Sequence, residues 1–267
     1  MTKVGLAGCG NIGGVVARAI DESRVNATIS GFYDNDEDRA SQLANGLRKK
    51  APVCTLEELI QRSDLIVEST VPAAVPDIVR TCLAARKDVM CLSVGGFLGH
   101  EDLFDLARER GCHIYIPSGA IAGLDGLRAA AMGRIDKVRL TTRKPPQNLA
   151  TADIVRKRGL SLEGLVGPLT IFEGPAREAV RHFPVNLNVA ASLSLAGIGA
   201  EATIVKVVAD PGLTSNVHEV EVEGEFGHLF VRLENVPSPD NPKTSYLAAL
   251  SALALLKRIT EPVQLGT

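Results

Sequence analysis

A glycine-rich segment close to the N-terminus carries the clearest chemical signal in the sequence. Residues 8–13, Gly-Cys-Gly-Asn-Ile-Gly, match the pattern G-x-G-x-x-G. They follow a short apolar run at residues 3–7 and lead into apolar residues at helical spacing from Ile12 to Ile20. A strand, a glycine turn and a helix in this order form the phosphate-binding unit of dinucleotide-binding proteins. A glycine turn without a ligand is the alternative, and the matched context argues against it.

Each glycine of this segment has a separate physical role in such a site. The first permits a tight turn, the second lets the backbone approach a pyrophosphate, and the third lets the helix pack closely on the strand. Backbone N–H groups and the helix dipole then hold the phosphates. The predicted cofactor-binding residues of the segment are Gly8, Gly10, Asn11, Ile12 and Gly13.

Two further polar residues follow apolar runs in the same half of the chain. Asp34 comes directly after the run at residues 29–33, ~20 residues past the glycines, where a carboxylate binds the adenosine ribose hydroxyls and repels a 2′-phosphate. The position favours NAD over NADP, although Arg39 is near enough to soften the preference; capping the next helix is the alternative role for Asp34. Thr70 follows the buried run at residues 65–67 and is expected at the same sheet edge, where the cofactor crosses.

Histidine titrates near neutral pH and suits proton transfer, and one of the five histidines stands out. Around His218 the order Asn-Val-His-Glu-Val-Glu-Val-Glu predicts a strand with two unlike faces. The predicted covered face holds Asn216, His218, Val220 and Val222. The predicted wet face holds Val217, Glu219, Glu221 and Glu223. On this pattern alone, a buried structural histidine is the more frequent case. Simpler helix-end, structural or hairpin-arm roles fit His100, His113, His182 and His228.

Composition and spacing exclude several other functions. The 267 residues carry a formal net charge of -2 and no Trp, so neither a basic surface nor a stacking platform for nucleic acid is expected. No apolar run reaches the ~18 residues of a membrane-spanning helix. The five cysteines form no C-x-x-C pair, and no His/Cys cluster has metal-ligand spacing. We therefore predict a cytoplasmic protein without a disulfide framework, a metal, a membrane span or a nucleic-acid partner.

The elements that position these residues fall into two groups. In residues 1–117, strand-like runs alternate with helical patterns, which predicts a Rossmann-type, doubly wound parallel sheet. The strands are expected at 3–7, 29–33, 65–67, 89–94 and 113–116. The helices are expected at 12–20, 36–47, 75–85 and 101–110.

After Pro117 the alternation stops and strands begin to follow one another, which predicts an α+β domain with a mixed open sheet at residues 118–240. Small residues at 118–126 open a helix, and a hairpin is expected around residues 224–227. The strands are expected at 137–142, 203–208, 217–223 and 228–234. The further helices are expected at 175–182 and 187–198. Residues 241–267 contain an Ala/Leu-rich helix, 246–256, that is expected to pack back on the first domain.

With these residues identified, the chain resembles the L-aspartate dehydrogenase family over nearly its full length. The later stretches are far more specific than the glycine pattern. The matching stretches are residues 8–13, 117–125 (PSGAIAGLD), 142–146 (TRKPP), 183–190 (FPVNLNVA), 209–211 (ADP), 216–219 (NVHE) and 241–244 (NPKT). The resemblance implies oxidation of L-aspartate to iminoaspartate with NAD or NADP, a role in NAD biosynthesis and a homodimer.

The resemblance also implies roles for particular residues. The active-site histidine of the family corresponds to His218, and its nicotinamide-side contacts correspond to the backbone of Ala122 and to Asn188. Capping of a helix is the alternative for Asn188, and Asn186 could fill that role equally well. Because aspartate has two carboxylates, donor and cationic groups are expected around it. The candidates are Ser118, Thr141, Thr142, Arg143 and Lys144, with a solvated strand end as the alternative for the last two.

We therefore expect an NAD(P)-dependent L-aspartate dehydrogenase. NAD should lie across the carboxyl edge of the first sheet, and the second domain should cover the nicotinamide and hold the substrate. A related reductase of another small carboxylate, of homoserine or dihydrodipicolinate type, is the alternative within enzymes. A nicotinamide-binding sensor without catalysis is the alternative outside them.

Overall fold

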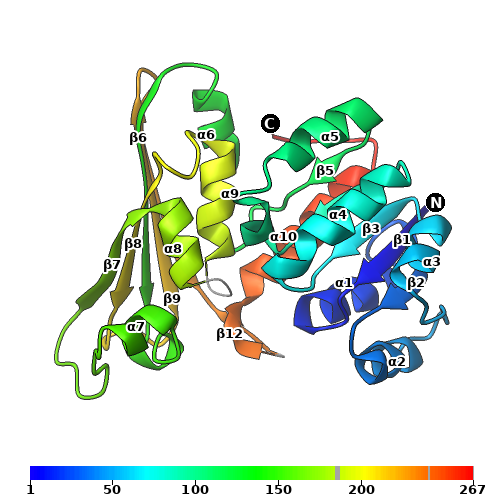
Figure 1. The fold of residues 1–267 in the computed structure, drawn as a ribbon, viewed down its shortest axis with the longest axis horizontal. Coiled ribbons are helices and arrows are strands. Elements are labelled where there is room, and N and C mark those ends of the chain that lie inside the picture. Colours follow the sequence, from blue (N-terminus) through cyan, green and yellow to red (C-terminus); the bar gives the residue numbers. More distant parts are fainter. Residues whose placement is uncertain (184–186, 240, 267) are drawn as a thin grey trace. The chain divides into compact units, whose positions relative to one another are not determined.

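The computed structural model describes residues 1–183, 187–239 and 241–266, with the main chain alone at 241–243. These residues form two compact units (Figure 1). The first contains Met1–Pro117 and Ala249–Leu265, and the second contains Ser118–Ala248. The chain returns to the first unit within its last helix, later than the change at 240–241 expected from the sequence.

The first unit is built on a five-stranded sheet in which every strand pair is parallel, as the alternating pattern predicts. The strand order is β2-β1-β3-β4-β5. The order reverses beside β1, which pairs with both β2 and β3. The strands are β1 (Thr2–Ala7), β2 (Ala27–Tyr33), β3 (Leu65–Glu68), β4 (Asp88–Cys91) and β5 (Ile114–Tyr115).

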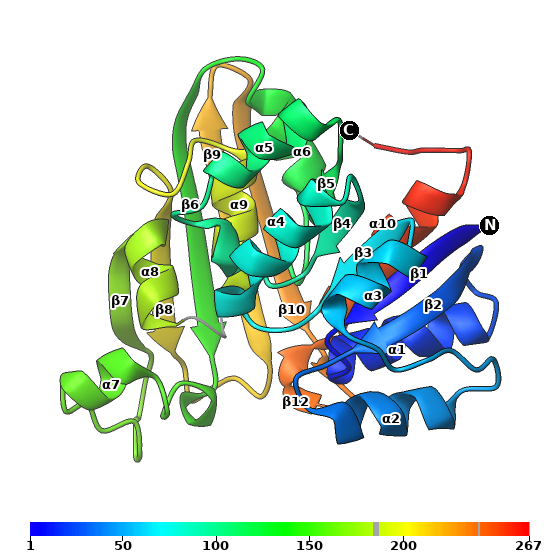
Figure 2. The same cartoon turned by 45° about the vertical axis from the view of Figure 1, so that its right-hand side comes forward.

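Helices cover both faces of this sheet (Figure 2). On one face, Val16 and Ile20 share a buried core with Val4 and Leu6 of β1. The last helix joins the same core through Leu256, because its Ala/Leu-rich sequence offers an apolar stripe. The helices of this unit are α1 (Asn11–Asp21), α2 (Glu37–Gly46), α3 (Leu56–Arg62), α4 (Val75–Ala84), α5 (Asp102–Arg110) and most of α10 (Tyr246–Thr260).

The structure departs from the predicted elements at two places in this unit. Helix α3 was not predicted, although Thr55 and Glu58 form a reciprocal capping box at its start. The fourth strand, predicted to reach Val94, ends at Cys91, and Val94–Phe97 forms a 3-10 turn, η2. A second 3-10 turn, η1 (Pro72–Ala74), precedes α4.

The second unit is built on a mixed five-stranded sheet, in agreement with the predicted α+β domain. Its order is β10-β9-β6-β8-β7, with β6 and β8 parallel and the other neighbours antiparallel. The expected hairpin is present, and Gly224 pairs with Gly227, so its loop has only two residues. The strands are β6 (Ile135–Lys144), β7 (Leu169–Pro175), β8 (Ile204–Ala209), β9 (Asn216–Gly224) and β10 (Gly227–Asn235).

Helices α6, α8 and α9 lie on one face of this sheet (Figure 1). Strand β7, helix α7 and the small β11–β12 pair were not predicted. No described helix is long and apolar enough to cross a membrane. The remaining elements are α6 (Leu124–Ala130), η3 (Pro146–Asn148), α7 (Asp153–Lys157), α8 (Ala176–His182), α9 (Asn188–Ala196), β11 (Pro237–Ser238) and β12 (Asn241–Ser245).

Candidate functional site

A cavity of about 530 Å³ lies in the first unit at the carboxyl ends of β1, β2 and β3. This is where the strand order reverses, and ligands of open α/β sheets bind at such a point. Most of the predicted cofactor residues line the cavity. They are Gly8, Gly10, Asn11, Ile12, Asp34 and Thr70.

The glycine turn has the backbone geometry that a bound pyrophosphate requires. Gly8 has φ +98°, and a Cβ there would lie 2.5 Å from the Ser69 carbonyl oxygen. A Cβ on Gly13 would lie 2.1 Å from the carbonyl oxygen of Gly8, so helix and strand are in close contact. A Cβ on Gly10 would meet no described atom within 4 Å. Packing therefore does not explain the glycine at position 10, whereas the approach of a ligand does.

The start of α1 is suited to a phosphate. Its cap residue is Gly10, which offers no side-chain acceptor to the first N–H groups, and its first turn holds no acidic residue. Such a helix start satisfies its N–H groups with an anion. The residues present thus fit a dinucleotide.

Asp34 ties the end of β2 to the glycine turn. Its Oδ2 accepts a 2.7 Å hydrogen bond from the Cys9 N–H, and its Oδ1 accepts one of 3.0 Å from the Asp36 N–H. The cap of α2 is Asp36, which accepts from the Arg39 N–H, so the alternative role for Asp34 is filled by its neighbour. The Arg39 guanidinium lies 3.5 Å from Asp34 Oδ1 and lines the same cavity.

Several residues that line the cavity were not predicted from the sequence. Tyr33 donates to Asn35 Oδ1 at 2.7 Å, and both face the cavity beside Asp34. On the other side the wall continues through the turn after β3 into α4. These residues are Ser69, Val71, Ala74, Asp77 and Ile78, with Leu56 from α3. The sequence feature that could have identified most of them is their position at or after the ends of β2 and β3, because these strands end at the same sheet edge as the glycine turn.

In the second unit, His218 forms part of a buried polar cluster on the helix-covered face of the sheet. Strands β6 and β9 pair Thr142 with His218, and Thr142 Oγ1 lies 3.1 Å from His218 Nδ1. Lys144, two residues further along β6, is buried on the same face. Asn216 of β9 is also buried, and its Oδ1 accepts a 3.4 Å hydrogen bond from Asn148.

The environment of this cluster disfavours positive charge. Burial, and then the charge of Lys144, lowers the pKa of His218 from 6.5 to about 3. Burial also lowers the pKa of Lys144 from 10.5 to about 8. At neutral pH the imidazole is therefore uncharged and the lysine carries the charge. Within the described part of the chain, Thr142 is the hydrogen-bond partner of the ring, and the second ring nitrogen has none.

The predicted alternation of β9 holds with one exception. All four residues predicted on the covered face are buried, and the three glutamates of the other face are partly exposed. Val217, predicted to be wet, is only 1% exposed. Its neighbours across the sheet are Arg143 and Glu234, and long charged side chains cover apolar ones with their stems.

Among the five candidate substrate residues, the structure separates Thr141 and Arg143 from the cluster. Residues alternate between the faces of β6, so Thr142 and Lys144 share the covered face and the other two point away. Arg143 lies 3.5 Å from Glu219 and 3.9 Å from Asp210. It is an ion-pair partner on the outer face, away from His218 and Lys144.

The remaining predicted residues lie in loops and helix starts of the second unit. Ser118 and Ala122 belong to the loop before α6, which Asn235 of β10 fixes by a 3.1 Å bond to the Ala120 carbonyl. Asn188 is the first residue of α9, whose cap is Leu187, so the capping role does not apply to it. Asn186 lies outside the described residues.

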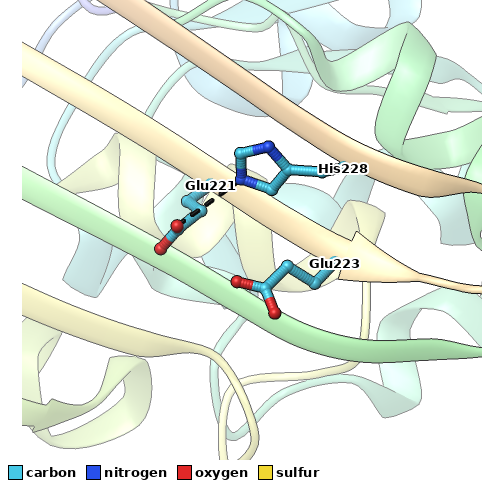
Figure 3. Close-up of side chains that lie close together, drawn as sticks. All are labelled: Glu221, Glu223 and His228. Atoms are coloured by element: carbon cyan, nitrogen blue, oxygen red, sulfur yellow. Dashed lines mark ion pairs between the residues drawn. The ribbon is translucent and has the colours of Figure 1, made fainter.

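A second group of ionisable side chains lies on the outer face, where Glu221, Glu223 and His228 come together (Figure 3). The Lys137 ammonium lies 3.0 Å from Glu221 and 2.7 Å from Glu223, and His228 lies 3.5 Å from Glu221. This pairing lowers the pKa of Glu221 and raises that of Lys137. A cation of the chain thus already pairs with both carboxylates of this group.

Comparison with known proteins gives a separate family match for each of the two parts of the chain. Residues 8–117 match the family model "Homoserine dehydrogenase, NAD binding domain", and residues 125–259 match "Aspartate dehydrogenase, C-terminal". An L-aspartate dehydrogenase from Methanosarcina barkeri is 51% identical over 100% of both chains. The chain belongs to the L-aspartate dehydrogenase family. It is thus an oxidoreductase whose first unit is a domain for NAD or NADP.

More distant members of the L-aspartate dehydrogenase family cover the chain as fully. One from Bradyrhizobium diazoefficiens is 40% identical over 99% of this chain and 94% of its own. A crystal structure of aspartate dehydrogenase from Thermotoga maritima matches with a TM-score of 0.75 and 26% identity over 100% of both chains. A homoserine dehydrogenase from Thiobacillus denitrificans shares the fold, with a TM-score of 0.60 and 14% identity.

Proposed function

We propose that this chain oxidises L-aspartate to iminoaspartate with NAD or NADP. The observation that carries the proposal is the buried cluster of Thr142, His218 and Lys144, in the unit that matches the C-terminal family model. The cavity at Gly8–Gly13 and Asp34 takes the dinucleotide. When bound, the nicotinamide accepts the hydride that leaves the substrate Cα.

Lys144 supplies the positive charge that a dicarboxylate needs. A buried ammonium is a strong partner for a carboxylate, because little water competes with it. Since burial holds the pKa of Lys144 near 8, this charge is present at neutral pH and is lost in mild alkali. An anion bound beside it favours the charged form and raises that pKa again.

His218 is suited to accept a proton from the substrate amino group. With Nδ1–H donating to Thr142 Oγ1, the lone pair of Nε2 is available for the substrate. In the unliganded protein the imidazole resists protonation, since its pKa is about 3. Two substrate carboxylates nearby bring negative charge and offset Lys144, which raises the proton affinity of the ring. The substrate thereby helps to activate its own base.

The proposal is tested by a substrate panel with the purified protein. NADH or NADPH formation is followed by absorbance with L-aspartate, L-homoserine and other small amino and hydroxy acids. We expect reduced cofactor with L-aspartate, together with oxaloacetate and ammonia from hydrolysis of the imine. Turnover of another substrate without L-aspartate would favour a related reductase. NAD binding without turnover on any substrate would favour a sensor.

The finer predictions from the resemblance are part of the same proposal. They are a homodimer, a cytoplasmic location and a role in NAD biosynthesis. Support for the dimer comes from Phe226 and Phe230 of the β9–β10 hairpin, which are large apolar side chains about half exposed. Light scattering on the purified protein measures the mass directly, and a monomeric mass would remove this part of the proposal.

A further inference from the structure

Glu68 ends β3 with a wholly buried carboxylate at the point where the strand order reverses. Its Oε1 accepts hydrogen bonds from both the N–H and the hydroxyl of Thr70, each 2.7 Å long. Its Oε2 accepts a 3.1 Å bond from the N–H of Ser93. One carboxylate thus fixes the turn after β3 and the turn after β4.

These two turns are packed closely, so the position of one constrains the other. A Cβ on Gly96, in the turn after β4, would lie 2.3 Å from the carbonyl oxygen of Pro72, which follows β3. On the other side, the Ser69 hydroxyl donates to the carbonyl of Gly8 at 2.8 Å. Glu68 is therefore tied through its neighbours to the glycine turn as well (Figure 2 shows β1, β3 and β4 side by side).

Packing alone does not explain a carboxylate at this position. Among the described residues, no lysine or arginine pairs with Glu68, and its buried neighbours include the thiols of Cys82 and Cys91. A buried charge without a counter-ion is costly, and a neutral side chain could tie one turn at lower cost. What the carboxylate adds is two acceptor oxygens for three donors.

This arrangement restricts what the hydroxyl of Thr70, a residue of the cavity wall, can do toward a ligand. A hydroxyl has one proton, and that proton is directed to Glu68 Oε1. Toward the cavity the oxygen can present only lone pairs. It can accept from an N–H or O–H group of a ligand, and it cannot donate to a phosphate oxygen.

We propose that Glu68 is a positioning residue that locks Thr70 as an acceptor for an N–H or O–H group on the nicotinamide half of the dinucleotide. The inference rests on the proposed function, because it takes the cavity as the dinucleotide site. The phosphates carry no such donor, and the adenosine ribose hydroxyls are matched by Asp34. The adenine amino group belongs to the same nucleoside and lies with it at the end of β2, whereas Thr70 follows β3, on the other side of β1. The nicotinamide ribose hydroxyls and the carboxamide remain.

The test is a double-mutant cycle on NAD affinity with Glu68→Gln and Thr70→Val. Glutamine offers one acceptor oxygen to three donors, so one turn is released or the Thr70 hydroxyl is reoriented. We expect each single variant to weaken NAD binding by about 10-fold, and the double variant by far less than the ~100-fold of independent effects. Thr70→Ser keeps the hydroxyl and should bind within about 3-fold of the wild type.

A matched control separates positioning from general stability. Asp21 is a buried carboxylate that also ties a loop, accepting from the N–H groups of Arg48 and Lys49 at 3.0 and 2.8 Å, and it does not line the cavity. Asp21→Asn should lower the thermal midpoint and leave NAD affinity unchanged. ADP, which has both phosphates and no nicotinamide, should bind equally to the wild type, Thr70→Val and Glu68→Gln.

Additive effects in the cycle, or an equal loss of ADP affinity in Thr70→Val, would overturn the inference. If Glu68→Gln does not fold, the same cycle is measured with Glu68→Asp. The aspartate side chain is one methylene shorter, so it keeps the carboxylate but moves its oxygens away from the three donors. A wild type that oxidises aspartate but shows additive effects removes this inference alone. A wild type that binds NAD without oxidising aspartate removes the proposed function alone, and the absence of NAD binding removes both.

Discussion

Thr142 and His218 face each other across the central pair of antiparallel strands in the second unit, with 3.1 Å between Oγ1 and Nδ1. The register of β6 on β9 fixes this pairing, because a shift of one residue would turn His218 to the outer face. The ring is therefore oriented by the main chain as much as by its hydrogen bond. Among the described residues, none forms a hydrogen bond with Nε2, so this nitrogen is available to a substrate.

His218→Ala should lower kcat by about 10²–10⁴-fold, since it removes the group that accepts the substrate proton. NAD affinity should not change, because the dinucleotide cavity is lined by residues of the first unit. Steady-state kinetics and NAD titration measure the two effects. His228→Ala is the matched control, because His228 lies in the same sheet on its exposed face. Equal loss of kcat in both variants would contradict the role of His218.

Thr142→Val should lower kcat by about 10-fold with little change in the KM for aspartate, because the ring loses its orienting partner but keeps its place on β9. Thr142→Ser keeps the hydroxyl and should restore the rate. Combined with His218→Ala, the valine substitution should add almost nothing, since its effect passes through the ring. A full 10-fold loss on top of His218→Ala would show that Thr142 acts independently.

Lys144 should give dicarboxylate binding a distinctive pH dependence. Succinate has two carboxylates and no amino group, so its inhibition constant reports the charge of the site without interference from the substrate amine. Because the pKa of Lys144 is about 8, the affinity for succinate should be constant from neutral pH up to about pH 8 and fall above it. Lys144→Met should bind weakly at every pH. The neighbouring variant Arg143→Met, on the outer face, should keep the wild-type profile.

The stability of the protein in acid should depend on His218. Its pKa is about 3 in the folded protein and near 6.5 in the unfolded chain, so below pH 6.5 the unfolded chain binds the extra proton. This contribution is therefore present above pH 6.5 and is lost as the pH falls toward 3. Between pH 7 and pH 4, urea unfolding should show about 3 kcal/mol more loss of stability for the wild type than for His218→Gln. Equal losses would show that the ring can be protonated in place.

The order of elements in the first unit could be predicted because its buried strands and amphipathic helices have different periods. Helix α3 was missed because only Leu59 and Ile60 are buried in it, too few to show a helical period. The fourth strand was predicted to reach Val94, although it ends at Cys91, because Leu92 and Val94 are apolar and are buried like strand residues. Burial alone does not distinguish a strand from a turn.

The candidate site shows a similar limit. The position of Gly8, Gly10 and Asp34 at the cavity could be predicted, since it depends on local sequence. Thr141 and Thr142 are adjacent and chemically alike, and only the strand faces separate them. The signal was present, because Val138 and Leu140 mark the covered face by alternation. Glu68 could not be assigned from sequence, since its partner Ser93 follows a different strand.

Asp34 and Arg39 should set the choice between NAD and NADP in opposite directions. The Asp34 carboxylate repels a 2′-phosphate, and the Arg39 guanidinium, 3.5 Å from it, is able to pair with one. Asp34→Asn keeps an acceptor for the Cys9 N–H while it removes the charge. It should raise the ratio of kcat/KM for NADP to that for NAD by about 10-fold or more, as one charge repulsion is worth at least that factor in a partly buried site. Arg39→Ala should lower the same ratio.

Asp36→Asn is the control, because Asp36 also pairs with Arg39 but caps α2 and does not line the cavity. If Asp36→Asn changed the ratio as much as Asp34→Asn, net charge near the cavity, rather than contact with the ribose, would determine the preference.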